Sequence, residues 1–232
     1  YGTSLELDPD LVRTVEVLRG AATLTEGSGA IGGVVLAETL DAADLLAPDR
    51  QYGARARAGY ASNDEGRRSS ASAYGRPLDA LDLLVSGTWR DTELIELSDG
   101  RRLRDSAEQQ WSSLLKAGVS TALGRWSASH RQGSVERLEP FDATGNAVGL
   151  FGTVRRRTDD ASTVLRYRSD GGADWLDAGA TFAYTDKRVT DAGSSVADGT
   201  DEFDYGIWTL DLRNDFAHRI GPVDGTLRVG VQ

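Results

Sequence analysis

The stretch GSGAIGG, residues 27–33, is the first candidate for chemistry in this 232-residue chain. Its glycines spell G-x-G-x-x-G, a pattern that cradles a dinucleotide pyrophosphate when a strand precedes it and a helix follows. Here the next residues, Val34 to Thr39 (VVLAET), are strand-like, and no second βαβ crossover follows. The sequence therefore argues against a nucleotide site. We expect the glycines to serve close backbone packing or a turn with positive φ.

Histidine and acidic side chains are the other candidates. The chain has two histidines and no cysteine, so it holds no disulfide, thiolate metal site or thiol nucleophile. An acidic cluster offers oxygen ligands of the kind that Ca²⁺ takes, but its spacing matches no metal loop, and we expect a solvated acidic loop. The cluster comprises Asp198, Asp201, Glu202 and Asp204. No Ser/His/Asp set or His-based metal motif occurs. The sequence thus predicts a protein that is not an enzyme, without catalytic residues or a metal site.

The charge balance disfavours a nucleic-acid partner. Asp and Glu together number 36 against 26 Lys and Arg, which gives a net charge of −10, and phosphates would be repelled without a concentrated basic stripe. The nearest approach to one is Arg155, Arg156 and Arg157, followed at once by Asp159 and Asp160. We expect this triplet to lie in a solvated loop.

The ends of the chain suggest a piece of a longer protein. The first residues, YGTSLELDPD, lack the basic and apolar regions of a signal peptide. The sequence contains no methionine. No run of about 18 apolar residues suits a membrane-spanning helix. We interpret the chain as a fragment or a processed piece.

Strand periodicity dominates from about residue 51 onward. In residues 80–91, Leu83, Val85 and Trp89 share one face, and polar side chains share the other. The same alternation marks eight further segments, at about 52–62, 68–76, 108–122, 125–134, 161–170, 174–186, 204–216 and 223–231. This pattern predicts strands with one apolar and one charged face.

The connections between these segments alternate between short and long. Tight turns occur at GRPLD, LGR, SDGGA and HRIGPVD, and long loops are predicted at about 92–107, 135–160 and 187–202. This alternation is typical of an outer-membrane β-barrel. Aromatic residues near the strand ends fit the interfacial girdles of such a barrel: Tyr52, Tyr60, Trp89, Trp126, Tyr184 and Trp208. The alternative is a soluble β-sandwich or adhesin-like module that transports nothing, whose strands would average five or six residues.

Residues 15–39, VEVLRGAATLTEGSGAIGGVVLAET, carry a resemblance to a known family. They resemble the closing section of the plug domain of TonB-dependent outer-membrane receptors, with its V-E-V-x-R-G-P strand, Y-G turn, G-S-G-A-x-G-G stretch and apolar strand. Ala21 stands where the family usually has Pro, and Glu26 where it often has an aromatic residue. The matching residues are Glu16, Arg19, Gly20, Gly27, Ser28, Gly29, Ala30, Gly32, Gly33 and Thr39.

The resemblance implies a fold and a domain division. It places the C-terminal part of a plug domain at residues 1–46 and the N-terminal part of a transmembrane β-barrel at residues 47–232. The expected fold is all-β: a partial transmembrane antiparallel β-barrel, about nine strands of an expected 22, preceded by the end of the plug. Residues 38–46, ETLDAADLL, resemble the heme and hemoglobin receptor branch more than the siderophore branch.

The function implied by the resemblance is TonB-dependent transport of an iron-bearing ligand across the outer membrane of a Gram-negative bacterium. The expected ligand is heme, free or from hemoproteins, and a receptor for ferric siderophores or another nutrient is the alternative. No cofactor is expected to be bound permanently, so heme enters as the transported ligand. The expected partners are the TonB–ExbB–ExbD complex, engaged through an N-terminal part outside this chain, the heme or hemoprotein ligand, and outer-membrane lipid.

The resemblance also suggests how the plug is held. Charged residues on the lumen face of the barrel would hold a polar plug through rearrangeable ion pairs: Arg55, Arg57, Asp82, Arg90, Asp211 and Arg213. Glu16 and Arg19 are expected at the plug–barrel boundary, or paired within the plug, and the motif glycines would pack plug backbone. His130 is the candidate axial ligand for heme iron, with a plain surface or loop position as the alternative, and His218 falls at a periplasmic turn. The family's FRAP–NPNL segment lies farther along the barrel.

Overall fold

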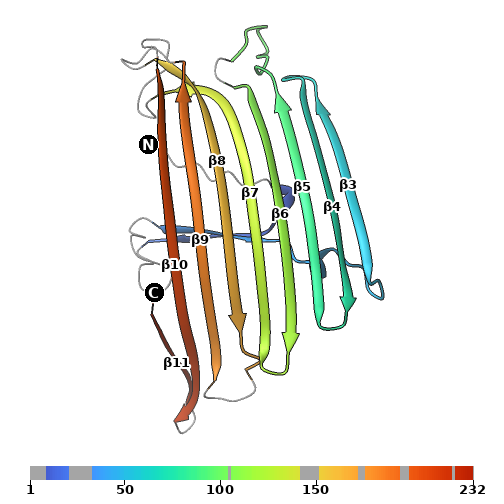
Figure 1. Cartoon of the computed structure of the whole chain (residues 1–232), viewed down its shortest axis with the longest axis vertical. Coiled ribbons are helices and arrows are strands. Elements are labelled where there is room, and N and C mark those ends of the chain that lie inside the picture. The colour runs from blue at the N-terminus through green and yellow to red at the C-terminus, as the bar shows by residue number, and fades with distance from the viewer. Residues whose placement is uncertain are drawn as a thin grey trace.

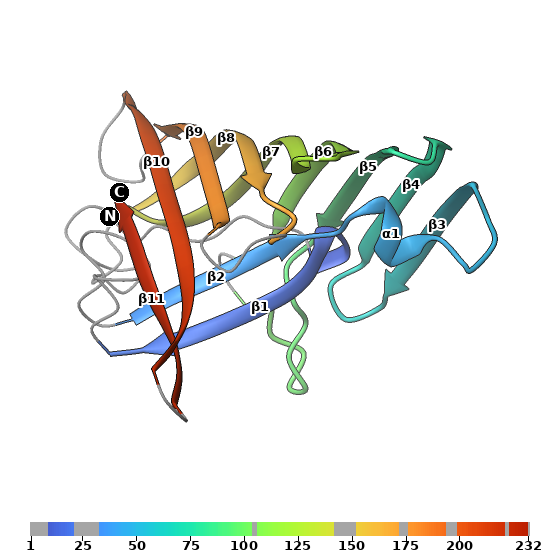
Figure 2. The same cartoon turned by 90° about the horizontal axis from the view of Figure 1, so that it is seen from below.

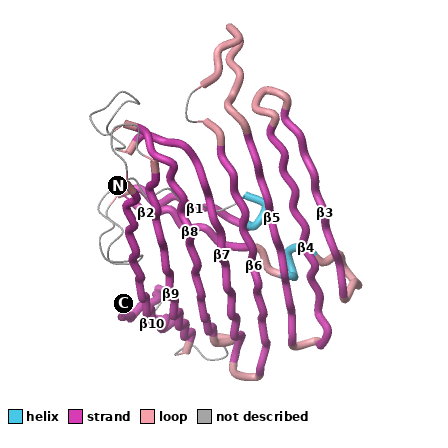
Figure 3. The backbone as a smooth tube through the Cα atoms, turned by 45° about the horizontal axis from the view of Figure 1, so that its top comes forward, coloured by secondary structure: helices cyan, strands magenta, loops and turns pink. Residues whose placement is uncertain are grey.

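The chain forms two antiparallel β-sheets, and in Figure 1 the smaller sheet crosses behind the larger one. The computed structural model describes residues 9–20, 33–103, 106–141, 152–171, 176–193, 199–220 and 223–231. In the smaller sheet, β1 (Val12–Arg19) pairs with β2 (Gly33–Thr39); the 3₁₀ turn η1 (Pro9–Leu11) precedes it, and the one-turn helix α1 (Ala42–Leu45) follows. We call η1, β1, β2 and α1 the N-terminal segment. Figure 3 shows that strands make up most of the backbone, which confirms the all-β prediction.

The larger sheet contains nine strands that pair in sequence order, each antiparallel to the next. They are β3 (Tyr52–Ala61), β4 (Gly66–Leu78), β5 (Leu81–Thr92), β6 (Glu108–Thr121), β7 (Gly124–Pro140), β8 (Thr153–Arg168), β9 (Asp177–Ala192), β10 (Thr200–Ile220) and β11 (Val223–Val231). Tight connections such as 79–80 and 122–123 lie at one end of the sheet, and the strand ends that flank the long connections 93–107 and 141–152 lie at the other. No helix within the described ranges is long and apolar enough to span a membrane.

The two faces of the larger sheet differ in chemistry. We call the face that carries the N-terminal segment the inner face; Figure 2 shows the β1–β2 hairpin lying against it. On β5, Val85 points outward and is 52% exposed, whereas Asp82 and Ser86 point inward and are 7% and 5% exposed. This split follows from the two-residue repeat of a strand, and it confirms the predicted faces.

Aromatic side chains gather on the outer face. The ring centroids of Trp126 and Tyr167 lie 4.5 Å apart, and Trp208 packs against Tyr184 at 4.1 Å and Phe182 at 5.4 Å. Tyr and Trp are favoured where an apolar surface meets water, because each ring carries a polar group. The outer face therefore has the composition of a lipid-facing wall.

Strands β7 and β8 extend well into a region that the sequence predicted as a loop. Residues 135–140 and 153–160, predicted as parts of a loop, lie in β7 and β8. The arginine triplet is thus in a strand and not in a solvated loop: Arg155 pairs with Glu136 at 2.9 Å, while Arg156 turns to the inner face. The prediction failed because cross-strand ion pairs replace apolar side chains here, so the hydrophobic alternation that marks a strand is missing.

The predicted solvated loop at the acidic cluster is wrong for the same kind of reason. Glu202 and Asp204 lie in β10 and not in a loop, and their carboxylates lie 3.0 and 2.8 Å from Nε of Arg188 on β9. Asp201 is also in β10, and Asp198 lies outside the described residues. Glu202 and Asp204 therefore belong to a cross-strand charge pattern.

Candidate functional site at the inner face of the sheet

A small apolar cluster fastens the N-terminal segment to the inner face. Leu11 of η1 and Ala42 of α1 are 0% and 1% exposed, and they cluster with Leu84 of β5 and Leu114 of β6, which are 2% and 1% exposed. Partly buried apolar residues pack around this cluster: Leu40, Leu45, Leu46 and Tyr74. The resemblance implied that polar contacts hold the plug, whereas this contact between the N-terminal segment and the larger sheet is apolar.

Asp10 makes the first polar contact between the two parts. Its carboxylate accepts hydrogen bonds from Nη1 of Arg57 at 2.7 Å and from Oγ of Ser70 at 2.8 Å. Its backbone carbonyl accepts a longer one from Arg55 at 3.4 Å. Burial raises the pKa of Asp10, but the hydrogen bonds from Ser70 and Arg57 and the two arginine charges outweigh it, so the pKa lies below its usual value. The predicted inward positions of Arg55 and Arg57 are confirmed.

Lys116 of β6 makes the second polar contact. Its ammonium group lies 3.0 Å from Oδ1 of Asp41 and donates to the carbonyl oxygen of Thr39 at 3.2 Å. The side chain is 11% exposed, so water screens this contact less than a surface pair. A looser pair joins Arg166 of β8 to Glu38 of β2 at 3.8 Å. Polar contacts to β3, β4, β6 and β8 therefore surround the apolar cluster.

The Asp10 contact predicts a pH dependence of the docking. Because the pKa of Asp10 is lowered by docking, its stabilising contribution is present above about pH 4 and is lost as the pH falls through the lowered value. Asp10→Asn should weaken docking by less than about 1 kcal/mol at neutral pH, since Arg57 is 55% exposed. The measurement is the protection of the N-terminal segment from protease in the full-length protein, recorded as a function of pH.

The control for this experiment is Asp99→Asn. Asp99 is also a carboxylate with a lowered pKa, bonded to Arg101, but it lies in the connection between β5 and β6. The control should keep the acid-induced loss of protection seen in the wild type, and Asp10→Asn should lose part of it. An identical pH profile in the wild type and Asp10→Asn would contradict the assignment.

Other charged residues of the inner face pair with one another. Arg156 donates Nε and Nη2 to the carboxylate of Asp191 at 2.6 and 2.7 Å and Nη1 to Glu139 at 2.6 Å. Arg125 of β7 donates to Asp82 of β5 at 2.6 Å, which confirms the inward position of Asp82. Arg90, Asp211 and Arg213 also fall on the inward side of the strand alternation, as predicted. Arginine–carboxylate pairs therefore join neighbouring and next-nearest strands on the inner face of the larger sheet.

The motif glycines are only partly within the described residues. Gly27, Gly29 and Gly32 lie outside them. Gly20 follows β1 with φ +96°, and Gly33 begins β2 with φ +137°. A Cβ atom on Gly33 would lie 2.4 Å from the carbonyl oxygen of Leu18. Both positions use the positive φ that glycine tolerates.

Glu16 and Arg19 lie in β1 opposite Leu36 and Gly33 of β2, and both are exposed. Within the described part of the chain, neither side chain has an ion pair. Their predicted place at a plug–barrel boundary, or paired within the plug, stays a prediction.

Neither histidine lies at the inner-face cluster. His130 is on the outer side of β7, where its Nδ1 lies 2.9 Å from Oγ1 of Thr163. Its role as an axial heme ligand stays a prediction, and the geometry matches the alternative of a surface histidine. His218 lies near the end of β10, close to the short turn, where it pairs with Gly225. Within the described ranges, no three His, Cys, Asp or Glu residues are grouped to hold a metal ion.

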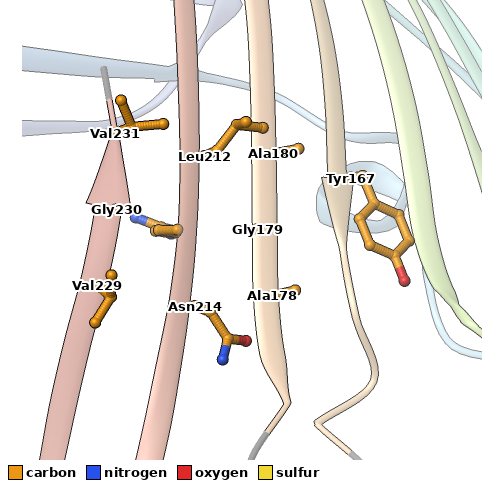
Figure 4. A pocket seen from close by; sticks show the side chains of 10 residues that line it. Tyr167, Ala178, Gly179, Ala180, Leu212, Asn214, Val229, Gly230 and Val231 are labelled. Atoms are coloured by element: carbon orange, nitrogen blue, oxygen red, sulfur yellow. The ribbon is translucent and has the colours of Figure 1, made fainter.

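A shallow hollow of about 460 Å³ lies across β9, β10 and β11, bounded by Tyr167 of β8 (Figure 4). Small and apolar residues line most of it, among them Ala178, Ala180, Leu212, Val229 and Val231. These side chains belong to the outer face, so the hollow is separate from the docking contacts of the N-terminal segment.

Sequence comparison finds heme receptors. No family model matches the chain. The chain is 34% identical over 187 residues to the hemin receptor of Yersinia enterocolitica. The aligned region covers 79% of this chain and 27% of that protein. It is 40% identical over 84 residues to the heme transporter BhuA of Brucella abortus, over 35% of this chain and 13% of that protein. The chain thus spans about a quarter of the length of the first of these relatives.

Comparison of folds finds iron transporters. The apoprotein form of the FrpB iron transporter from Neisseria meningitidis, F5-1 variant, superimposes with a TM-score of 0.74 at 26% identity, over 97% of this chain and 35% of that one. The F3-3 variant gives a TM-score of 0.77 at 24% identity, over 90% of this chain and 35% of that one, and it supports the fold alone. The sequence match and the fold match therefore each cover only part of a larger protein.

Proposed function

We propose that this chain, which is part of a TonB-dependent receptor related to the hemin receptors, serves the import of heme across the outer membrane of a Gram-negative bacterium. The observation that carries the proposal is the 34% identity to a hemin receptor over 79% of the chain. The apolar and aromatic outer face supports the membrane location. The relatives are named as receptors and transporters, which supports a role other than catalysis.

The two sheets suggest a domain division, which we propose here. We assign residues 1–46 to the end of the plug domain and residues 47–232 to the start of the barrel. The assignment is supported by the end of α1 at Leu45 and the start of the nine-stranded sheet at Tyr52. The inner face is then the wall of the lumen, and the N-terminal segment is plug that rests against it.

The contacts of the proposed plug suit a part that must be held and also moved. The apolar cluster is small, and the polar contacts through Asp10 and Asp41 can exchange for water as they break. A pull from the TonB–ExbB–ExbD complex, applied through residues upstream of this chain, would therefore meet limited resistance. Heme is the transported ligand in this scheme and not a resident cofactor.

The test of the proposed ligand is equilibrium binding by the full-length receptor in detergent. Hemin should bind with a shift of its Soret band, and a ferric hydroxamate siderophore should neither bind nor compete. Siderophore binding without hemin binding would overturn the proposal in favour of a siderophore receptor. Failure to bind either would leave no support for iron-ligand import.

A further inference from the structure

We propose that Arg68 of β4 and Arg90 of β5 form a binding site for the carboxylate groups of the imported ligand. This inference rests on the proposed function, because it names the part of the receptor that would recognise the propionates of heme. The site lies on the inner face, next to the docked N-terminal segment.

The strand register brings the two arginines together. Arg68 and Arg90 are directly opposite each other in the β4–β5 pair. Each lies two residues from an inward-facing residue: Ser70, which bonds Asp10, and Thr88, which is buried at 7% exposure. Both arginines therefore share the inner face, one position beyond the Asp10 contact and toward the end with the long connections. Among the residues that the structure describes, Arg68 is exposed and Arg90 is half-buried.

In the described part of the sheet, Arg68 and Arg90 lack a carboxylate partner, unlike several other arginines of this face. Elsewhere on this face Arg57 pairs with Asp10, Arg125 with Asp82 and Arg156 with Asp191. Among the residues that the structure describes, no carboxylate pairs with Arg68 or Arg90, although the chain carries 36 Asp and Glu residues. Like charges directly opposite in a sheet are destabilising. An anion that contacts both guanidinium groups would reduce the repulsion between them.

The residues opposite the two arginines on the outer neighbouring strands carry no charge: Gly59 of β3 faces Arg68, and Gln110 of β6 faces Arg90. The side chain of Arg68 lies over Gly59 of β3: a Cβ atom on Gly59 would come within 2.8 Å of Nε of Arg68. Its guanidinium group thus leans toward β3, away from Arg90 and β5. On the other side Arg90 faces Gln110 of β6 in the register, and this residue supplies a neutral amide rather than a competing charge.

The chemistry of the pair favours carboxylates. A guanidinium group binds a carboxylate through two parallel N–H···O bonds, which are stronger than neutral hydrogen bonds. Two such groups on adjacent strands suit a ligand with two carboxylates on one edge, and heme carries two propionates. Metal chelation by the same residues is unfavourable, because arginine stays protonated.

The experiment compares hemin with hemin dimethyl ester, whose carboxylates are blocked, on the full-length receptor. Arg68→Gln and Arg90→Gln should each weaken hemin binding about tenfold, the loss expected for one charge-assisted hydrogen bond. The affinity for the dimethyl ester should stay within about twofold of wild type. The matched control is Arg67→Gln: Arg67 is the next residue on β4, points outward and lies opposite Asp91. It should change neither affinity.

The outcomes separate this inference from the proposed function. Suppose that the wild type binds hemin. If the variants bind hemin as tightly as the wild type, or lose affinity for hemin and for the ester to the same extent, the proposed carboxylate site is wrong and heme import stands. If the wild type does not bind hemin, the proposed function fails, and titration with inorganic pyrophosphate then decides the site. Pyrophosphate binding that is lost in the double variant supports an anion site, and absence of binding in the wild type overturns it.

Discussion

Leu11→Ala is expected to loosen the N-terminal segment from the sheet by about 3 kcal/mol, the typical result of emptying a fully buried leucine site. Leu11 is 0% exposed and lies in one cluster with Leu84 and Leu114 of the wall. The contact through Asp10 cannot compensate, because Asp10 sits beside Leu11 in η1 and depends on the same placement.

The measurement for Leu11→Ala is amide hydrogen exchange of the N-terminal segment in the full-length receptor. Exchange in β1 and β2 should rise roughly 100-fold, the equivalent of about 3 kcal/mol. Val17→Ala is the matched control, because Val17 lies on β1 but is 59% exposed. Equal protection in both variants would show that the apolar cluster does not hold the segment. Exchange in the strands of the larger sheet should be equal in the wild type and the variants, because a rise there would indicate global unfolding.

Gly33→Ala should open the β1–β2 hairpin at its first pair. The added Cβ atom would lie 2.4 Å from the backbone oxygen of Leu18, and backbone atoms on both sides leave little freedom to move. The φ of +137° adds strain of its own for alanine. Together these effects should cost at least about 2 kcal/mol of hairpin stability.

Gly20→Ala separates the two causes. Gly20 also has a positive φ, +96°, but nothing lies within 4 Å of its hypothetical Cβ atom. It should therefore show the backbone strain without the clash. Hydrogen exchange at Leu18 and Val34 is the readout. If Gly33→Ala exchanges no faster than Gly20→Ala, the close approach of β1 and β2 is not what requires glycine at position 33.

The strand alternation carried most of the fold prediction. The outward Val85 and the inward Asp82 follow directly from their spacing in sequence, and the resemblance of residues 15–39 led to the family. The ends of β7 and β8 escaped prediction because ion pairs such as Arg155–Glu136 replace the apolar stripe. An apolar pattern cannot reveal a strand whose two faces are both charged.

The inner-face site was less predictable. Leu84 and Leu114 fall on the polar side of their strands, and only the presence of Leu11 and Ala42 explains why they are apolar. Lys116 carries no local signal, because its partners Thr39 and Asp41 lie in a different part of the chain. The pairing of Arg68 with Arg90 depends on the register between β4 and β5, which the sequence pattern does not specify.

Uptake of isotope-labelled hemin tests the central claim most directly. The full-length gene, expressed in a Gram-negative strain that lacks its own heme receptors, should allow hemin to accumulate in the cells, and loss of TonB should abolish accumulation. Cell-surface binding should persist without TonB, since binding precedes the energised step. Hemin uptake that is equal with and without TonB, or no uptake alongside uptake of a ferric siderophore, would contradict the assignment of this chain to a TonB-dependent heme importer.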